Sequence, residues 1–211
     1  MKIKYSLAIS LLFNVIFICL CAYIFRDKWI QKIVALKGDA KIVMFGNSLT
    51  AQGKWVELLG RTDVLNSGFA GLTTYHFLGL LQDNVIEKHP KICFVEAGIN
   101  DITVGVSAEK IQKNYTTILN TLEKNNIIPI VTLTFYEQND PVSKSEVDRL
   151  NHFLIKYCEK HTIKFINLNP LISDSTGLKA EFAVDKTHLN DKGYKIWARE
   201  IEKVLNQKIS Q

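Results

Sequence analysis

The sequence predicts an α/β protein in which a five-stranded parallel sheet lies between two layers of helices, a three-layer α/β/α sandwich. Short apolar runs alternate along the chain with longer segments in which apolar residues recur at helical spacing. The first run of the domain, Ile42 to Phe45, is apolar at every position, which is typical of a strand buried on both faces. Strands that alternate with helices form βαβ units, and these units place helices on both faces of a sheet.

The N-terminal segment is uncharged from Tyr5 to Phe25. At about 1.5 Å per helical residue, this run reaches roughly 30 Å, which is enough to cross the apolar core of a bilayer. We therefore expect residues 1–26 to form a hydrophobic helix that acts as an uncleaved signal anchor and transmembrane segment, with cleavage after Ala22 as the alternative. Residues 27–40 are expected to form a short amphipathic linker.

Positive charge flanks both ends of this segment, with Lys2 and Lys4 before it and Arg26, Lys28 and Lys32 after it. The positive-inside rule therefore does not decide its orientation. We expect the folded domain to be exported and held on the periplasmic or extracellular side of a membrane, or to be secreted if the segment is cleaved.

The folded domain is expected over residues 41–211, which is about the size of one α/β domain. Strands are predicted at residues 42–45, 63–66, 92–96, 127–133 and 164–168. Helices are predicted at residues 55–59, 74–87, 108–124, 145–161 and 191–206. Asn190 is the expected cap of the last helix, and Trp197 within that helix is expected to pack in the core.

The composition is that of an ordinary globular protein, with 47% hydrophobic and 22% charged residues and a net charge of +5. No basic stripe is interleaved with aromatic residues, so nucleic-acid binding has no support. The four cysteines lie in apolar or helical patterns and read as buried thiols instead of a disulfide framework or a metal site. The oligomeric state is left open.

Ser48 is the candidate nucleophile. The run Ile42 to Phe45 ends at Gly46, which allows a sharp turn, and the turn delivers Ser48 to the carboxyl end of a central strand. In open parallel sheets, ligands bind at this edge. The alternative is that Ser48 only caps the helix that follows.

A serine hydroxyl needs a base, and the usual base is a histidine oriented by a carboxylate. Of the five histidines, His188 differs because Asp185 lies three residues before it in a turn ahead of the last helix. Asp185 could contact one ring nitrogen and leave the other for Ser48. A helix-entry turn with an incidental aspartate and histidine is the alternative.

Acyl transfer also needs hydrogen-bond donors for the oxygen that becomes negative. Two polar turns at strand ends could supply them. The glycines Gly68 and Gly71 follow the second strand and allow a backbone N–H to approach a ligand, and Asn100 places a side-chain amide after the third strand.

These turns together resemble the sequence blocks of the SGNH/GDSL hydrolases, in the order found in that family. The similar stretches are Phe45-Gly-Asn-Ser48-Leu-Thr, Asn66-Ser-Gly68, Gly98-Ile-Asn100-Asp101 and Asp185-Lys-Thr-His188. The resemblance spans about Lys41 to Leu205 and implies a flavodoxin-like SGNH fold. It is greatest to the small acylhydrolases related to platelet-activating-factor acetylhydrolase subunits.

The resemblance implies a Ser48-His188-Asp185 triad that forms an acyl-enzyme. It implies an oxyanion hole made of the Ser48 N–H, the Gly68 N–H and the Asn100 side chain, and no metal or organic cofactor. One departure is Asn47, where the namesake motif has aspartate. Candidate substrate-binding residues are Phe69, Ile102 and Tyr136, within a wider rim of Leu49, Leu72, Thr103, Val104, Phe135 and residues 173–184.

We expect an esterase that removes a small O-acyl group, in first place acetyl, from a carbohydrate, with small lipid esters as another substrate class. Three alternatives remain open at this point. One is an O-acyltransferase that modifies an envelope polymer with a membrane partner. A second is a lysophospholipase or thioesterase of the same family, and the third is a non-catalytic glycan-binding module.

Overall fold

The computed structural model describes the backbone of residues 2–37 and 40–208 and the side chains of residues 11–34 and 40–207. A parallel sheet forms its centre, with the strand order β2-β1-β3-β4-β5. The strands are β1 (Ile42–Gly46), β2 (Val64–Gly68), β3 (Ile92–Glu96), β4 (Ile128–Thr132) and β5 (Lys164–Ile166). This confirms the predicted five-stranded parallel sheet, and no strand end differs from its predicted position by more than two residues.

The five predicted helices of the domain are also present. They are α3 (Trp55–Leu58), α4 (Thr74–Asn84), α6 (Ala108–Lys124), α7 (Pro141–His161) and α9 (Asp191–Lys208). The predicted helix at 74–87 breaks at Val85 and continues as the 3-10 turn η1 (Ile86–Lys88). Short elements that the sequence did not predict are α2 (Ser48–Gln52), α5 (Ile99–Thr103), α8 (Asn169–Ile172), η2 (Ala180–Phe182) and the small hairpin of β6 (Ser173–Asp174) and β7 (Gly177–Leu178).

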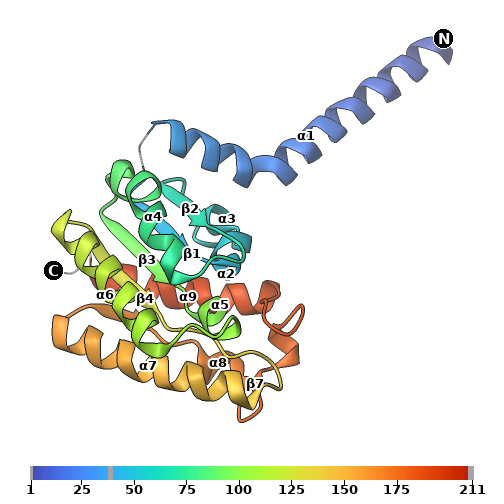
Figure 1. The fold of residues 1–211 in the computed structure, drawn as a ribbon. Coiled ribbons are helices and arrows are strands. Elements are labelled where there is room, and N and C mark those ends of the chain that lie inside the picture. Colours follow the sequence, from blue (N-terminus) through green and yellow to red (C-terminus); the bar gives the residue numbers. More distant parts are fainter. Residues whose placement is uncertain (1, 38–39, 209–211) are drawn as a thin grey trace.

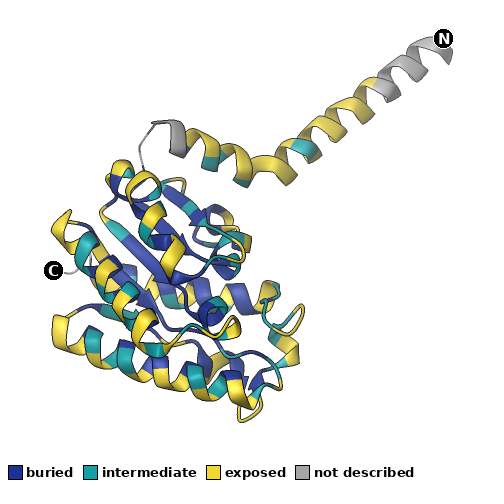
Figure 2. Cartoon of the chain, in the orientation of Figure 1, coloured by how far each residue is buried: buried dark blue, intermediate teal, exposed yellow. Residues whose placement is uncertain are grey.

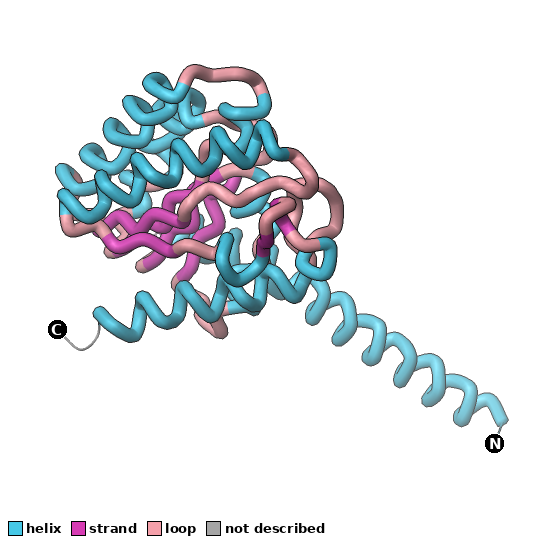
Figure 3. The backbone as a smooth tube through the Cα atoms, turned by 90° about the horizontal axis from the view of Figure 1, so that it is seen from below, coloured by secondary structure: helices cyan, strands magenta, loops and turns pink. Residues whose placement is uncertain are grey.

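Alternation along the strands divides the core into two layers. In β1, Val43 and Phe45 pack on one face, which α4, α6 and α7 cover. Ile42 and Met44 pack on the other face, which α3, α8 and α9 cover. Figures 1 and 3 show the sheet between these helix layers, and Figure 2 shows the buried residues concentrated along it. The three-layer sandwich is confirmed.

The last helix behaves as predicted at both of its marked positions. The Asn190 side chain accepts hydrogen bonds from the backbone N–H groups of Lys192 (3.0 Å) and Gly193 (3.2 Å), and so it caps α9. Trp197 is fully buried and packs edge-on against Trp55, with 4.8 Å between ring centroids.

The buried-thiol prediction is confirmed for Cys93 and Cys158 and is wrong for Cys19, which is exposed on the N-terminal helix. That helix, α1 (Lys2–Lys37), is continuous, so the segment predicted as a linker is helical as far as Lys37. Figure 1 shows its first half extending away from the domain and its second half lying beside β2.

The second half of α1 is fastened to the open edge of the sheet by Gln31. The Gln31 side chain donates to the carbonyl of Val64 (3.0 Å) and accepts from the N–H of Asn66 (2.7 Å). These are backbone groups of the edge strand β2, so the amide satisfies atoms that would otherwise lack a partner at this edge. Residues 27–37 therefore belong structurally to the domain.

The membrane-spanning segment expected at residues 1–26 is not found in the part of the chain that the structure describes. The side chains of residues 1–10 lie outside that part. Among the described residues, no helix combines the length and the apolar character needed to cross a membrane, because Arg26, Asp27 and Lys28 follow Leu11–Phe25 within α1.

Candidate active site

Ser48 lies where β1 ends and α2 begins, at the carboxyl edge of the central strand. The cap of α2 is Asn47, whose side-chain oxygen accepts a hydrogen bond from the Leu49 N–H at 2.8 Å. Because Asn47 takes the capping role, the alternative in which Ser48 is only a helix cap is wrong. Ser48 is the first residue of α2 and is half-buried.

His188 and Asp185 complete a hydrogen-bonded chain with Ser48. The Nε2 atom of His188 lies 2.9 Å from Ser48 Oγ. Its Nδ1 atom lies 2.9 Å and 3.0 Å from the two carboxylate oxygens of Asp185. A carboxylate at Nδ1 favours the tautomer with the proton on that atom, which leaves Nε2 to accept the serine proton.

The Asp185 carboxylate is held ionised by the turn itself. It accepts the backbone N–H groups of His188 and Thr187, each at 2.8 Å. These bonds, together with the contact to the His188 ring, lower the pKa of Asp185 to about 2. The aspartate therefore remains a hydrogen-bond acceptor for His188 throughout the neutral range.

A second carboxylate, that of Glu137, is hydrogen-bonded to the turn of residues 185–188, which is called the catalytic turn below. Glu137, which is 6% exposed, accepts from the hydroxyls of Thr187 (2.8 Å) and Ser143 (2.9 Å). The Lys186 ammonium binds Asp140 at 2.8 Å and lies 3.8 Å from Glu137. The loop after β4 thus fixes the two residues between Asp185 and His188, a contact for which the sequence offered no local signal.

Gly68 does not have the free N–H that the predicted oxyanion hole requires. It pairs with Gly46 as the last residue of β2, and its N–H donates to the Asn66 side chain at 3.0 Å. The same Asn66 amide donates to the carbonyls of Ala51 and Gly53, each at 3.1 Å, so it fastens β2 to the end of α2. Gly68 is a packing position.

Gly71 is the glycine whose N–H remains available. It is exposed and has a positive φ of 75°. Among the residues that the structure describes, its N–H has no hydrogen-bond partner. The Asn100 side chain donates to the carbonyl of Leu72 at 2.9 Å, so Asn100 contacts the residue after Gly71. The sequence signal for Gly71 was its place beyond the strand, whereas Gly68 still belongs to the paired run.

Asp101 supports this arrangement from the core. It is fully buried and accepts from the backbone N–H and the hydroxyl of Thr74, the first residue of α4. The turn from Gly71 to Thr73 leads into α4, and so it is held against α5, which carries Asn100.

The predicted rim residues have different surroundings. Phe69 is half-buried against the ring of Phe45, and Ile102 is packed between the two core layers. The Tyr136 hydroxyl is bound to Asp148, and the Lys144 ammonium lies 4.4 Å from its ring centre. Leu49 and Phe135 are buried in the core, so their predicted place on the rim is wrong.

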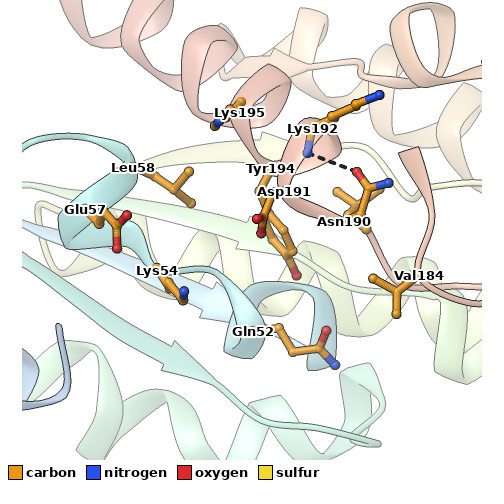
Figure 4. A pocket seen from close by; sticks show the side chains of 11 residues that line it. Gln52, Lys54, Glu57, Leu58, Val184, Asn190, Asp191, Lys192, Tyr194 and Lys195 are labelled. Atoms are coloured by element: carbon orange, nitrogen blue, oxygen red, sulfur yellow. Dashed lines mark hydrogen bonds between the residues drawn. The ribbon is translucent and has the colours of Figure 1, made fainter. Parts of the chain in front are cut away.

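A cavity of about 690 Å³ flanks the catalytic turn (Figure 4). Val184 and Leu189, the residues on either side of the Asp185–His188 turn, line one part of it. Polar and charged side chains, including Gln52, Lys54 and Glu57, line another part. Gln52 ends the short helix that Ser48 begins, so the cavity lies one helical turn from the serine.

The sequence model of the GDSL-like lipase/acylhydrolase family matches residues 44–196, which is more than half of the chain. The chain therefore belongs to this family of ester-hydrolysing serine hydrolases.

Among curated relatives, an N-acylneuraminate cytidylyltransferase from Streptococcus agalactiae is 22% identical over 139 residues, which cover 62% of this chain and 34% of that protein. The chain thus spans about a third of that relative's length. An uncharacterized lipoprotein from Bacillus subtilis is 29% identical over 45% of this chain and 48% of its own.

Solved structures share the fold. A GDSL-like lipase from Bacteroides thetaiotaomicron aligns with a TM-score of 0.73 and 21% identity, covering 82% of this chain and 90% of its own. An acetylxylan esterase from Geobacillus stearothermophilus aligns with a TM-score of 0.66 and 18% identity, covering 78% of this chain and 93% of its own.

Proposed function

We propose that this protein is an esterase that removes a small O-acyl group, in first place acetyl, from a carbohydrate. The observation that carries the proposal is the unbroken chain from Ser48 Oγ through His188 to Asp185, with contacts of 2.9 Å on each side of the imidazole. A glycan-binding module has no need of such a base.

In the proposed reaction, Ser48 Oγ attacks the acyl carbon while its proton moves to His188 Nε2. The carbonyl oxygen becomes negative and is stabilised by the Ser48 and Gly71 N–H groups and the Asn100 amide. His188 then gives its proton to the leaving alcohol, which departs and leaves the acyl group on Ser48. A water molecule, deprotonated by His188, releases the acid and restores the serine.

The carbohydrate part of the proposal rests on the cavity and the relatives. Its wall of amide, ammonium and carboxylate groups beside Val184 and Leu189 suits a hydroxyl-rich alcohol more than a long acyl chain. One structural neighbour is an acetylxylan esterase, and one curated relative is an N-acylneuraminate cytidylyltransferase, so both proteins are named for carbohydrate substrates.

The test is a panel of acetylated sugars, short- and long-chain nitrophenyl esters and lysolipids, assayed for acid release with the full chain and with Ser48→Ala. We expect acetate release from the sugars, fluorophosphonate labelling of the wild type and neither in Ser48→Ala. Release from lysolipids alone would contradict the carbohydrate class. Acetyl transfer almost wholly to an added sugar alcohol would identify an acyltransferase instead.

We also propose that α1 attaches the enzyme to a membrane and that the domain is exported. The support is the exposure of large apolar side chains around the helix, among them Phe13 (69%), Phe17 (65%) and Ile18 (65%). Side chains of this size on all sides of a helix favour a lipid environment over water.

Flotation with phosphatidylcholine–phosphatidylglycerol vesicles tests the attachment. We expect the full chain to float with the vesicles and the double variant Phe17→Lys/Ile18→Lys to remain below. The matched control is Val142→Lys, which removes an exposed apolar side chain from the domain, 74% exposed in the wild type, and should float. Equal flotation of all three proteins would contradict the proposal.

A further inference from the structure

Residues 47–50, which contain Ser48 and are called the nucleophile turn below, place two side chains against one buried carboxyl group. Asn47, immediately before Ser48, donates from Nδ2 to Glu96 Oε1 at 3.2 Å. Thr50, two residues after Ser48, places its hydroxyl 3.5 Å from Glu96 Oε2. Asn47, Thr50 and Glu96 are each no more than 1% exposed, so water does not compete for these contacts.

The position of Glu96 follows from the strand register. Glu96 ends β3 and lies beside Gly46, the last residue of β1. A Cβ atom at Gly46 would lie 2.2 Å from the Thr50 hydroxyl oxygen and 2.5 Å from the Glu96 carbonyl oxygen. The glycine therefore lets the start of α2 fold down onto the end of β3, where Glu96 meets it.

We infer that Glu96 is the positioning residue of the nucleophile turn and acts on Ser48 through Asn47 and Thr50. Residue 47 is asparagine in this chain because its side-chain amide can donate a hydrogen bond to Glu96. The inference rests on the proposed role of Ser48. Asn47 uses its oxygen to cap α2 at Leu49 and its nitrogen to bind Glu96, so one amide ties the helix to the sheet. An aspartate at residue 47 could provide the cap and could not donate the second bond.

The surroundings of Glu96 suit a carboxyl group in either protonation state. Burial raises the pKa of Glu96 to about 8, and the hydrogen bonds from Asn47 and Thr50 oppose this shift. When Glu96 is ionised, both neighbours can donate to it, and when it is protonated the Thr50 hydroxyl can accept its proton. Burial, and to a smaller extent the negative charge of Glu96, raises the pKa values of Tyr115 and Tyr194 well above the usual range, so both tyrosines stay neutral.

The first test compares Glu96→Leu, which removes the acceptor, with Glu96→Gln, which keeps one acceptor and adds a donor for Thr50. Because a misplacement of about 1 Å can cost about 10²-fold in rate, we expect Glu96→Leu to lose about 10- to 100-fold in kcat with little change in KM. Glu96→Gln should stay within about threefold of the wild type. The fluorophosphonate labelling rate should follow kcat.

The matched control is Thr132→Val. Thr132 pairs with Glu96 in the next strand, is fully buried, and has a hydroxyl without a hydrogen-bond partner among the described residues. This variant should leave kcat unchanged. A folded Glu96→Leu protein with wild-type kcat, or equal losses in Glu96→Leu and Glu96→Gln, would overturn the positioning role.

The second test uses Asn47→Asp, alone and with Glu96→Gln. Two carboxyl groups at this distance must share a proton, so Asn47→Asp should have a lower kcat than the wild type and a loss that grows as the pH rises. Asn47→Asp/Glu96→Gln regains a donor, from residue 96 to residue 47, and should recover the activity and pH profile of Glu96→Gln. An Asn47→Asp profile that superimposes on the wild type would overturn the role of the amide. Loss of the proposed esterase itself would appear separately, as wild-type protein no more active than Ser48→Ala.

Discussion

Replacing Gly68 by alanine should displace the helix that carries the nucleophile. A Cβ atom at Gly68 would lie 2.2 Å from the backbone nitrogen of Ala51 and 2.4 Å from its Cα. The optimal van der Waals separation of non-bonded carbon atoms is about 3.5 Å, so the backbones of β2 and α2 must move apart by about 1 Å. Ala51 belongs to α2, which Ser48 begins, and both colliding atoms are backbone atoms that no rotamer change can move.

A displacement of about 1 Å in a reacting group can reduce the rate by about 10²-fold. Overpacking of this kind costs about 1–3 kcal/mol of folding free energy, and at this chain length each kcal/mol lowers Tm by about 2–4 °C. We therefore expect Gly68→Ala to lose about 10²-fold in kcat on nitrophenyl acetate and to melt several degrees below the wild type.

The control is Gly79→Ala, in the interior of α4, where a Cβ atom would meet nothing within 4 Å. Alanine is a better helix former than glycine, so this variant should keep full activity and gain up to about 1 kcal/mol in stability. A Gly68→Ala protein with kcat within about threefold of the wild type and an unchanged Tm would refute the packing role assigned to Gly68.

Three further predictions concern other parts of the site and the last helix. Asn100→Ala should lower kcat by about 10²–10³-fold if its amide donates to the oxyanion, measured as kcat on a nitrophenyl ester, and an unchanged kcat would exclude that role. Because the pKa of Asp185 is lower in the folded protein than in the unfolded chain, its ionised carboxylate stabilises the folded state at pH values above about 4. This contribution to the free energy of unfolding is lost as the pH falls from about 4 through about 2. Unfolding curves over that pH window should show this dependence in the wild type and less of it in Asp185→Asn. Asn190→Ala removes the cap of α9 and should cost about 1 kcal/mol in denaturant unfolding, and a cost near zero would show that the cap bonds to Lys192 and Gly193 are not needed.

Local patterns were sufficient for the strands, the long helices and the three side chains that the structure brings together as Ser48, His188 and Asp185. The run Ile42 to Phe45 is apolar because both faces of β1 are covered, and so it predicted a central strand. Ser48, Asp185 and His188 lie in turns next to regular elements, where a polar residue stands out against its apolar neighbours.

Contacts between distant segments were not visible in the same way. Gly68 and Gly71 lie three residues apart, and only the structure shows that the Gly68 N–H donates to the Asn66 side chain whereas the Gly71 N–H has no partner among the described residues. Glu137 resembles any polar loop residue until Thr187 is brought to it from 50 positions along the chain. The Gln31 amide of α1 likewise binds a strand edge that the sequence does not mark, and Val34 of the same helix is buried in the core.

The nucleophile turn contains both kinds of information. The sequence by itself determined that a strand ends at Gly46, that Ser48 follows it, and that Asp185 and His188 lie near the end of the chain. These results were accessible because periodicity and turn chemistry are local properties. The tertiary structure decided that Asn47 caps α2 in place of Ser48, and that the Glu96 side chain contacts Asn47 and Thr50. Those outcomes depend on which strands become neighbours and in what register, and burial then fixes which polar groups must satisfy one another.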